Sequence, residues 1–405
     1  MRAASQRLPR SNSSVGALHE VQKAGTLRES CTPRAESGPA GILLAETGLQ
    51  SCEQRIRGEQ EKPVVPHKDC AASTLPLALP SLGTQEIFER ILPAGRGLQP
   101  VLRFVFQSEG KRLRPRLFYL SARLFNNPNE HLADAAVLVE ALHNGTLLHD
   151  DVMDRAKVRR NRPTVNRLWG DGVAILAGDF LLAAVMDLAL RTEHPSVLPL
   201  ALETLIQLVE GQMLELQNQG NLSLTEATSM EIIQKKTASL FAMACRLGGL
   251  LGRGAPDQVR ALESFGLHLG VAFQLLDDTQ DYTSVQSHTG KEPGRDLAEA
   301  KVTLPVLVAF RQAGTKEKKR IRSIFSDPRR AEHLKELTVL IGELGGFSYT
   351  LQRARDCMER AVRALQPIPA CPEKTAIEQT AREILRENTL QGSAHLPQET
   401  TRASA

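Results

Sequence analysis

The sequence predicts an all-α protein, and three observations lead to this prediction. Aromatic residues make up only 4% of the chain. The alternation of apolar and polar residues that is typical of strands is scarce. The middle of the chain is rich in Leu, Ala, Glu, Gln and Arg at helical spacing. With 41% hydrophobic residues over 405 positions, the chain can bury one large core or two ordinary ones.

The first 84 residues differ in composition from the rest. The opening segment "MRAASQRLPRSNSS" has three arginines and four serines, and no acidic residue precedes Glu20. This composition is typical of an organelle transit peptide, and a Pro- and Ser-punctuated linker follows it. We predict a largely disordered transit-like and linker region over residues 1–84, with mitochondrial import favoured and plastid import as the alternative. A disordered extension without an address is the competing interpretation.

Amphipathic segments broken by turn signals begin near Gln85. The clearest turn signals are residues 126–130, 191–197 and 252–258, and they predict about ten helices. No internal repeat is evident, which argues against a solenoid. We predict one domain over residues 85–390, followed by a polar tail over 391–405.

The most apolar window covers residues 172–190. It has about the length of a membrane span but carries Asp179 and Asp187. We therefore predict a buried core helix and not a transmembrane one.

Charge and cysteine content exclude several classes of protein. The formal net charge is only +4, and no basic run interleaved with aromatic residues is present, so nucleic acid is not an expected partner. The six cysteines show no C-x-x-C spacing and no zinc pattern. A reducing compartment fits this cysteine usage best.

Two aspartate clusters share the spacing D-D-x-x-D. They consist of Asp150, Asp151 and Asp154 in the first cluster and Asp277, Asp278 and Asp281 in the second. On a helix, the first and last aspartates lie one turn apart and project from the same face. Two such helices facing each other would supply hard oxygen ligands suited to Mg²⁺, which usually also bridges to substrate phosphates. One cluster alone would be read as a solvated helix face, but two copies favour a metal and phosphate site.

Short basic clusters accompany the aspartates. They are Lys111, Arg112, Arg114 and Arg116; Arg159, Arg160 and Arg162; Lys235 and Lys236; and Lys291, Arg295 and Lys301. Each alone would be read as a solvated face. Interleaved with two carboxylate clusters, they predict a clamp for diphosphate groups.

The order and spacing of these segments resemble the trans-isoprenyl diphosphate synthases. The matching segments are "GKRLRP", "LLHDDVMD" followed by "RRNRPTVN", "GDFLL", "KT", "FQLLDD" and "GKEPGRDLAEAKVTLP". The resemblance covers about residues 85–390 and is greatest to the long-chain members, the octaprenyl, solanesyl and decaprenyl diphosphate synthases. It implies an isoprenoid synthase type helical bundle with a central active-site cavity, a Mg²⁺ requirement, and a homodimer, with a heteromer as the alternative.

The resemblance also implies individual roles. Asp150, Asp154, Asp277 and Asp281 would hold Mg²⁺, and Asp151 and Asp278 would assist them in catalysis. The allylic diphosphate would be bound by Arg159, Lys236, Thr237, Gln274, Lys291 and Lys301. Isopentenyl diphosphate would be bound by Lys111, Arg114, His143 and Arg160, with Arg112 as a further contact. His149 is assigned a supporting place behind the aspartates.

The helix that ends in the first aspartate cluster should also line the cavity for the growing hydrocarbon. Gly145 would lie about 7.5 Å below the metal site and Leu142 about 12 Å below it. Short-chain relatives carry an aromatic floor near this position, whereas this chain has Gly145 and Thr146. The predicted consequence is a long apolar tunnel. The alternative is that Gly145 only allows close helix packing.

Three departures from the family pattern affect no metal or phosphate ligand. Asn161 stands where the family usually has glycine, and Ser108 and Glu109 precede Gly110 where a second glycine is common. Thr279 and Gln280 stand where aliphatic residues are frequent. Asn161 tolerates the left-handed backbone that a glycine would serve there, so we expect an altered turn and not inactivity.

We predict a Mg²⁺-dependent prenyltransferase that joins isopentenyl diphosphate to an allylic diphosphate and makes a long trans-polyprenyl diphosphate, for quinone side chains. The alternatives are a farnesyl or geranylgeranyl diphosphate synthase and a partner-binding subunit of a heteromeric synthase. A class I terpene cyclase would not need the "GKRLRP" segment or Arg160. The protein is not expected to span a membrane, although its lipid product would favour membrane association.

Overall fold

Helices form almost all of the described chain in the computed structural model. The residues that it describes are 83–94, 96–107, 112–125, 129–283 and 293–393. The predictions for residues 1–84 and 391–405 therefore lie largely outside the described residues. Those for Lys111 and Lys291 lie wholly outside them.

The helices follow the expected order. The first group comprises α2 (Thr84–Ile91), η1 (Arg96–Leu98), α3 (Gln99–Phe106), α4 (Leu113–Arg123) and α5 (Leu132–Met153). The next comprises α6 (Val165–Trp169), α7 (Asp171–Arg191), α8 (Val197–Gln217), α9 (Glu226–Ile233), η2 (Gln234–Ala238), α10 (Ser239–Leu251) and α11 (Pro256–Thr283). The last comprises α12 (Arg295–Ala298), α13 (Leu304–Gln312), α14 (Thr315–Ser326), η3 (Arg330–His333), α15 (Leu334–Glu343), α16 (Gly346–Ala364) and α17 (Pro372–Ser393).

Local sequence signals account for several helix ends. Proline lies in the first turn of α3, α11 and α13, where its missing N–H is not needed. The Thr225 side chain accepts a hydrogen bond from the N–H of Thr228 and so caps α9. The breaks predicted at 191–197 and 252–258 are confirmed, because α7 ends and α8 begins at the first, and α10 ends and α11 begins at the second. Short connecting helices raise the total above the predicted ten.

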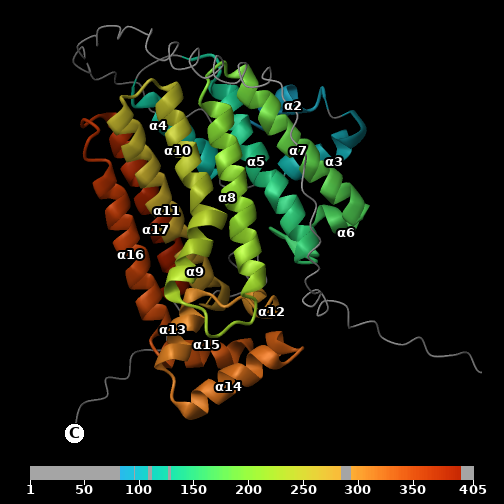
Figure 1. Cartoon of the computed structure of the whole chain (residues 1–405), viewed down its shortest axis with the longest axis vertical. Helices are drawn as coiled ribbons and strands as arrows, with labels where there is room; N and C mark the ends of the chain where they lie inside the picture. Colours follow the sequence, from blue (N-terminus) through green and yellow to red (C-terminus); the bar gives the residue numbers. More distant parts are fainter. Residues whose placement is uncertain (1–82, 95, 108–111, 126–128, 284–292, 394–405) are drawn as a thin grey trace, which may run out of the picture. The chain divides into compact units, whose positions relative to one another are not determined.

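The long helices pack side by side into a bundle. Figure 1 shows α5, α7, α8, α10, α11 and α16 running along one direction, with α12 to α15 at one end. α10 comes very close to both α4 and α11. A Cβ on Gly248 would lie 2.4 Å from the carbonyl oxygen of Phe118 in α4, and one on Gly266 in α11 would lie 2.5 Å from that of Phe241. Glycine is therefore required at both contacts.

Two apolar clusters form the core. One joins α2 to α5 with α7, α8 and one side of α10, and the other joins the opposite side of α10 with α11, α13, α16 and α17. Phe118, Phe241, Phe265 and Phe347 are among the largest fully buried side chains. Each such side chain stabilises the fold by roughly 1.5–3 kcal/mol relative to an exposed position.

The helix predicted over 172–190 is present as α7, but only one of its faces is buried. Ala177, Leu181 and Leu188 pack inward, whereas Leu176 and Leu190 are 61% and 65% exposed. α7 and α8 are both long and apolar enough to cross a membrane by length and composition, and 39% of each window is buried. The predicted buried core helix is therefore buried on one face only, and a second apolar face points outward.

Candidate active site

The first aspartate cluster lies where α5 ends. Asp154 follows the last residue of the helix, and its N–H donates to the carbonyl of Asp150 at 2.8 Å. Asp151 is buried, and its Oδ1 accepts a hydrogen bond from Arg159 Nε at 2.8 Å. The predicted helical spacing is confirmed, and Asp151 is paired with one of the predicted diphosphate ligands.

A two-residue hairpin carries the arginines after this cluster. Strands β1 (Val158–Arg159) and β2 (Arg162–Pro163) pair antiparallel, with Arg159 opposite Arg162. The loop residues Arg160 and Asn161 have φ values of 51° and 57°. Positive φ at both positions is what a type I′ turn requires. The expectation that Asn161 adopts the left-handed conformation is therefore confirmed.

The second cluster lies in the last two turns of α11. Asp278 accepts a hydrogen bond from Gln274 Nε2 at 2.7 Å, and Gln274 Oε1 accepts one from Thr237 Oγ1 at 2.8 Å. Thr237 belongs to η2, so this chain of hydrogen bonds joins two elements that carry predicted allylic diphosphate ligands.

Arg295 connects the two aspartate clusters. Its backbone N–H donates to Asp281 Oδ1 at 3.2 Å, and its side-chain Nη2 lies 3.4 Å from Asp154 Oδ2. Asp281 also accepts the N–H of Asp296 at 2.9 Å and so binds the first turn of α12. Clusters that are far apart in sequence therefore face one another, as their shared spacing predicted.

Glu215 and Glu299 belong to the site, although the sequence reading missed both. Lys236 pairs with Glu215, and Lys301 Nζ lies 3.5 Å from the same carboxylate. Lys301 also pairs with Glu299. One signal could have found Glu215: it lies seven residues after the buried Leu208, which places it on the inward face of α8.

The predicted lysine pair lies in a π-helical turn. Residues Gln234–Ala238 form η2, a π-helix between α9 and α10, of the kind often found at functional sites. A Cβ on Gly211 of α8 would lie 2.6 Å from the N of Lys236, and one on Gly270 of α11 would lie 2.6 Å from Ala238 Cα. Glycines on both neighbours thus let η2 approach closely enough to bring Lys236 and Thr237 into the site.

The two lysines of η2 differ in role. Lys235 pairs with Glu210 and Glu231 on the partly exposed side, at 3.0 Å each. Lys236 is the one directed to the aspartates, because its charge opposes the rise that burial causes in the pKa of Asp150. The assignment of Lys236 to the diphosphate stays a prediction.

The electrostatics of the aspartates suit a divalent cation. Burial raises the pKa of Asp278 to about 7, against the hydrogen bond from Gln274, and the charge of Asp277 adds to the rise. Burial also raises the pKa of Asp150 and of Asp151. Neighbouring carboxylates repel one another, which disfavours the ionised form of each. A hard cation such as Mg²⁺ between them stabilises their ionised forms. Among the described residues, no three His, Cys, Asp or Glu side chains already converge as a metal site.

A second group of basic residues lies apart from the aspartates. Arg114 Nη1 lies 3.3 Å from His143 Nε2, and its guanidinium stacks 4.5 Å above the ring of Phe241. Burial lowers the pKa of Arg114 to about 10, and it lowers that of His143 well below its usual value. His143 is therefore neutral, and no described carboxylate forms an ion pair with Arg114.

Comparison with known proteins decides the enzyme class. The Polyprenyl synthetase family model matches residues 96–341. The chain belongs to the polyprenyl synthetase family. Enzymes of this family are prenyltransferases, so the predicted family and enzyme class are confirmed.

Relatives of this polyprenyl synthetase include long-chain and shorter-chain enzymes. Octaprenyl diphosphate synthase of Haemophilus influenzae is 33% identical over 68% of this chain and 83% of that protein. Geranylgeranyl diphosphate synthase of Methanosarcina mazei is 34% identical over 72% and 91%. The solved polyprenyl synthase of Caulobacter crescentus CB15, complexed with calcium and isoprenyl diphosphate, is 31% identical, with a TM-score of 0.66 over 75% of this chain and 97% of that one. The predicted fold class is confirmed.

Arg112 serves the fold of the polyprenyl synthetase. Its Nη2 donates to Thr84 Oγ1 at 2.8 Å and to the carbonyl of Phe106 at 3.2 Å. These contacts join the starts of α2 and α4 to the end of α3. The diphosphate contact suggested for Arg112 stays a prediction.

The residues predicted to line a tunnel lie in tightly packed surroundings. A Cβ on Gly145 would lie 3.3 Å from Leu181 Cβ and 3.4 Å from the carbonyl oxygen of Gly178, both on α7. Leu142 is fully buried, and Thr146 Oγ1 donates to the carbonyl of His143 at 2.9 Å. This geometry supports the alternative reading, in which Gly145 allows α5 and α7 to pack closely, and it adds nothing to the tunnel assignment.

His149 contacts α7 directly behind the first aspartates. Its Nε2 lies 3.2 Å from the carbonyl oxygen of Ile175 and 3.3 Å from Asp179 Oδ1. A Cβ on Gly178 would lie 2.3 Å from this nitrogen, so the glycine makes room for the imidazole. His149 thus fixes the end of α5 against α7, which fits its supporting assignment.

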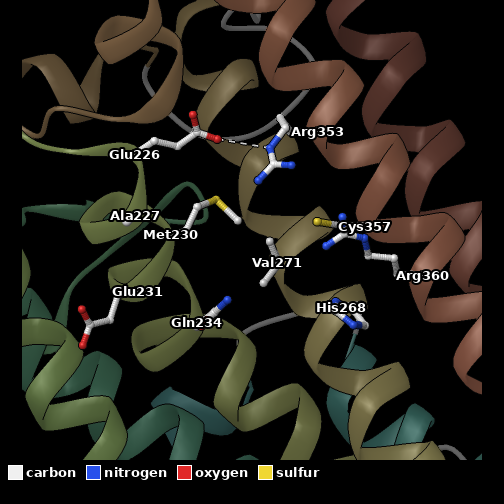
Figure 2. A pocket seen from close by; sticks show the side chains of 10 residues that line it. All are labelled: Glu226, Ala227, Met230, Glu231, Gln234, His268, Val271, Arg353, Cys357 and Arg360. Atoms are coloured by element: carbon white, nitrogen blue, oxygen red, sulfur yellow. Dashed lines mark ion pairs between the residues drawn. The ribbon is translucent and has the colours of Figure 1, made fainter.

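A separate pocket of about 430 Å³ lies between α9, η2, α11 and α16. Figure 2 shows Met230, Val271 and Cys357 on its walls and an ion pair between Glu226 and Arg353 at one end. None of the six aspartates lines it. This pocket is therefore distinct from the site that the aspartates form.

Proposed function

We propose that this polyprenyl synthetase joins isopentenyl diphosphate head-to-tail to an allylic diphosphate and extends it to a long trans-polyprenyl chain. The observation that carries the proposal is the position of Arg295, which is hydrogen-bonded to the second aspartate cluster and ion-paired with the first. Two carboxylate clusters therefore border one space, together with Lys236 and Lys301. The basic group around Arg114 offers a second anion site.

Divalent metal would be held by Asp150, Asp154, Asp277 and Asp281, with Mg²⁺ as the ion. Bound Mg²⁺ would stabilise the charge that develops on the departing diphosphate. Burial raises the pKa of both Asp150 and Asp278, and a divalent cation beside them would favour their ionised forms, which supports this proposal. The calcium in the Caulobacter relative supports a divalent ion in that protein.

The allylic diphosphate would lie against Arg159, Lys236, Thr237, Gln274 and Lys301. In the free protein, Lys236 and Lys301 are held by Glu215, which keeps both ammonium groups beside the aspartates. Preorganised donors of this kind stabilise a leaving group without reorganising during the reaction. The assignment of Lys291 to this set stays a prediction.

Isopentenyl diphosphate would be bound by Arg114, Arg160 and His143, with Lys111 as a further predicted contact. The neutral His143 can donate one ring hydrogen to the diphosphate, and the positive charge of Arg114 can offset part of the diphosphate charge. Binding two substrates in fixed positions supplies the orientation that the condensation needs. The proton lost at the end can pass to the departing diphosphate, so no side-chain base is required.

The product is proposed to be longer than four isoprene units. The octaprenyl relative supports this length, and the geranylgeranyl relative is the argument for the shorter alternative. Full-length protein would be incubated with Mg²⁺, labelled isopentenyl diphosphate and farnesyl or geranylgeranyl diphosphate, and the products resolved by length. Long products would support the proposal and a role in quinone side chains. A stop at three or four units would support the shorter-chain alternative, and no incorporation by the folded chain would favour a partner-binding subunit.

The outward faces of α7 and α8 support a homodimer. Exposed apolar residues recur on α8 at intervals of four and three, namely Leu202, Ile206, Val209, Met213 and Leu216. This spacing forms a helix-packing seam, and α7 adds Ile175, Leu176, Met186 and Leu190. A second copy of the chain would bury these faces.

Light scattering during gel filtration would test the dimer. Ile206→Glu combined with Val209→Glu should give monomers, whereas Val339→Glu, at an exposed apolar position on α15, should not change the mass. A monomeric wild-type chain would contradict the homodimer and favour a heteromer. Organelle import also stays a proposal, to be tested by the location of a fluorescent protein fused behind residues 1–84.

A further inference from the structure

Glu299 pairs with two cations at once. It directly follows α12, and its side chain is 14% exposed. Arg295 Nε lies 2.6 Å from Glu299 Oε1, and Lys301 Nζ lies 2.5 Å from Glu299 Oε2. Each carboxylate oxygen therefore faces a different basic group. A carboxylate that is withdrawn from water is stable when its charge is matched in this way.

The same two cations also contact Asp154, and both do so at a single oxygen. Arg295 Nη2 and Lys301 Nζ each lie 3.4 Å from Asp154 Oδ2, and the Asp154 side chain is only 6% exposed. Two acids and two basic groups thus alternate in a closed ring. The contacts with Glu299 are the shorter ones, so Glu299 attracts both cations more strongly than Asp154 does.

Arg295 depends on this ring more than Lys301 does. Lys301 Nζ has a third acid, Glu215, at 3.5 Å. Within the described part of the chain, the Arg295 side chain forms ion pairs with Asp154 and Glu299 and with no other acid. If Asp154 turned away, Glu299 would be the acid left to Arg295.

The backbone holds Glu299 in place independently of Asp154. The N–H of Glu299 donates to the carbonyl of Arg295 at 2.9 Å, which puts both side chains on one helical turn. The next residue, Ala300, accepts the N–H of Gly220 at 2.8 Å, so the turn that leads to Lys301 is tied to the segment after α8. Both cations can therefore keep their positions when the carboxylate of Asp154 moves.

A divalent cation at Asp154 would conflict with the contacts in this ring. Asp154 is one of the four aspartates proposed to hold Mg²⁺. A metal ion at its Oδ2 would stand beside Arg295 and Lys301, would compete with them for the same oxygen and would be repelled by both. An acid that kept both cations paired would remove this conflict.

We propose that Glu299 is a positioning residue for metal binding: it holds Arg295 and Lys301 while Asp154 exchanges these two cations for the divalent ion. The inference rests on the proposed function of Asp154 as a metal ligand. It follows that, without the charge of Glu299, both cations turn to Asp154 and the metal is bound more weakly.

Neutralising Glu299 tests this role. Glu299→Gln keeps the size of the side chain and removes its charge. Full-length protein would be titrated with Mn²⁺, which shares the preference of Mg²⁺ for carboxylate ligands, and the free ion would be followed by electron paramagnetic resonance. The dissociation constant for Mn²⁺ should rise by roughly fivefold or more, because Asp154 is then the main acceptor for Arg295. No substrate is present, so the readout does not depend on turnover.

A second background separates positioning from the general field of a negative charge. In Arg295→Gln, one of the two cations through which Glu299 acts is gone. Adding Glu299→Gln to this variant should then change the dissociation constant by about twofold or less. A general field would weaken Mn²⁺ binding equally in both backgrounds, and that result would overturn the inference.

Two variants serve as controls. Asp134→Asn removes a partly buried acid that pairs with Arg90 at 2.9 Å on the far side of α5 from the aspartates in sequence, and it should lower stability without changing Mn²⁺ binding. Asp150→Asn should weaken Mn²⁺ binding, since this residue belongs to the proposed metal site itself.

The outcomes distinguish the inference from the proposed function. If Glu299→Gln binds Mn²⁺ as the wild type does, or more tightly, the positioning role is wrong while the metal site stands. A wild-type chain that binds no Mn²⁺, or an Asp150→Asn variant that binds it unchanged, would remove both. If Glu299→Gln does not fold, Glu299→Asp takes its place. Its shorter side chain cannot reach both cations, so weaker binding than the wild type supports the role and unchanged binding overturns it.

Discussion

Lys301 Nζ lies 3.4 Å from Asp154 Oδ2, although 147 residues separate the two in the chain. Asp154 ends α5, and Lys301 follows the short helix α12. Burial lowers the pKa of Lys301, but Glu215, Glu299 and the neighbouring aspartates together raise it above the usual lysine value. A lysine that stays charged beside a predicted metal ligand is placed to neutralise a diphosphate held by that metal.

Asp154→Asn should lower turnover by about 10²–10³-fold, the range for removing one preorganised charge-stabilising group. The substitution removes the Asp154 carboxylate from Arg295 and Lys301, although both still pair with Glu299. Incorporation of labelled isopentenyl diphosphate at several Mg²⁺ concentrations is the measurement. Glu263→Gln is the matched control for loss of an acid outside the site. Near-normal turnover by Asp154→Asn would contradict the assignment of the first cluster.

Asn161→Val should destabilise the hairpin that carries Arg159 and Arg160. A β-branched residue at φ 57° is strained by roughly 1–2 kcal/mol. The expected result is a lower melting temperature and a raised KM for isopentenyl diphosphate, because Arg160 is in the same turn. Asn161→Gly is the control and should match the wild type in both measurements. If Asn161→Val also matched it, the left-handed turn would not be needed.

Ala300→Gly should stabilise the protein. Ala300 has φ 56°, and its carbonyl accepts the N–H of Gly220 at 2.8 Å, so this backbone is fixed in a left-handed conformation. Glycine removes a backbone strain of about 1–2 kcal/mol. Part of this gain is lost because glycine has more conformational freedom in the unfolded chain. Thermal unfolding should show a rise of a few degrees with unchanged kinetics. Ala376→Gly in α17, an ordinary helix position, should instead lower stability by about 1 kcal/mol.

The thiol of Cys245 should resist alkylation in the folded protein. It is fully buried, and burial raises its pKa to about 12, although the nearby Ser121 opposes the rise. Since the raised pKa keeps the thiol neutral, its labelling by iodoacetamide should not increase between pH 7 and pH 9. Mass spectrometry of the Cys245 peptide, before and after unfolding in guanidinium, is the measurement. Rapid native labelling would mean that α10 opens readily.

The fold class and the aspartates could be predicted because each depends on local spacing. A D-D-x-x-D pattern places Asp150 and Asp154 one turn apart in any helix, whatever packs against it. Asn161 was likewise predictable, since the left-handed conformation depends on the residue type and its own backbone. Both features can be predicted without knowing which elements pack against them.

Gly145 and Glu215 show where local spacing is insufficient. The space beside Gly145 depends on Leu181 and Gly178 of α7, and the sequence of α5 contains no information about them. Glu215 was not predicted as a site residue, because an acidic side chain on an amphipathic helix is usually solvated. The packing of α8 against η2 gives it Lys236 as a partner, and the segment after α12 gives it Lys301.

The sequence by itself determined that the chain is helical, that it carries two sets of metal-suited carboxylates, and which family it resembles, because periodicity and motif spacing are properties of the chain alone. Only the tertiary structure decided that Arg295 joins the two sets and that Arg114 contacts His143 without an ion-pairing carboxylate among the described residues. Charges interact through space over a few ångströms, so their partners are set by helix packing and not by sequence distance.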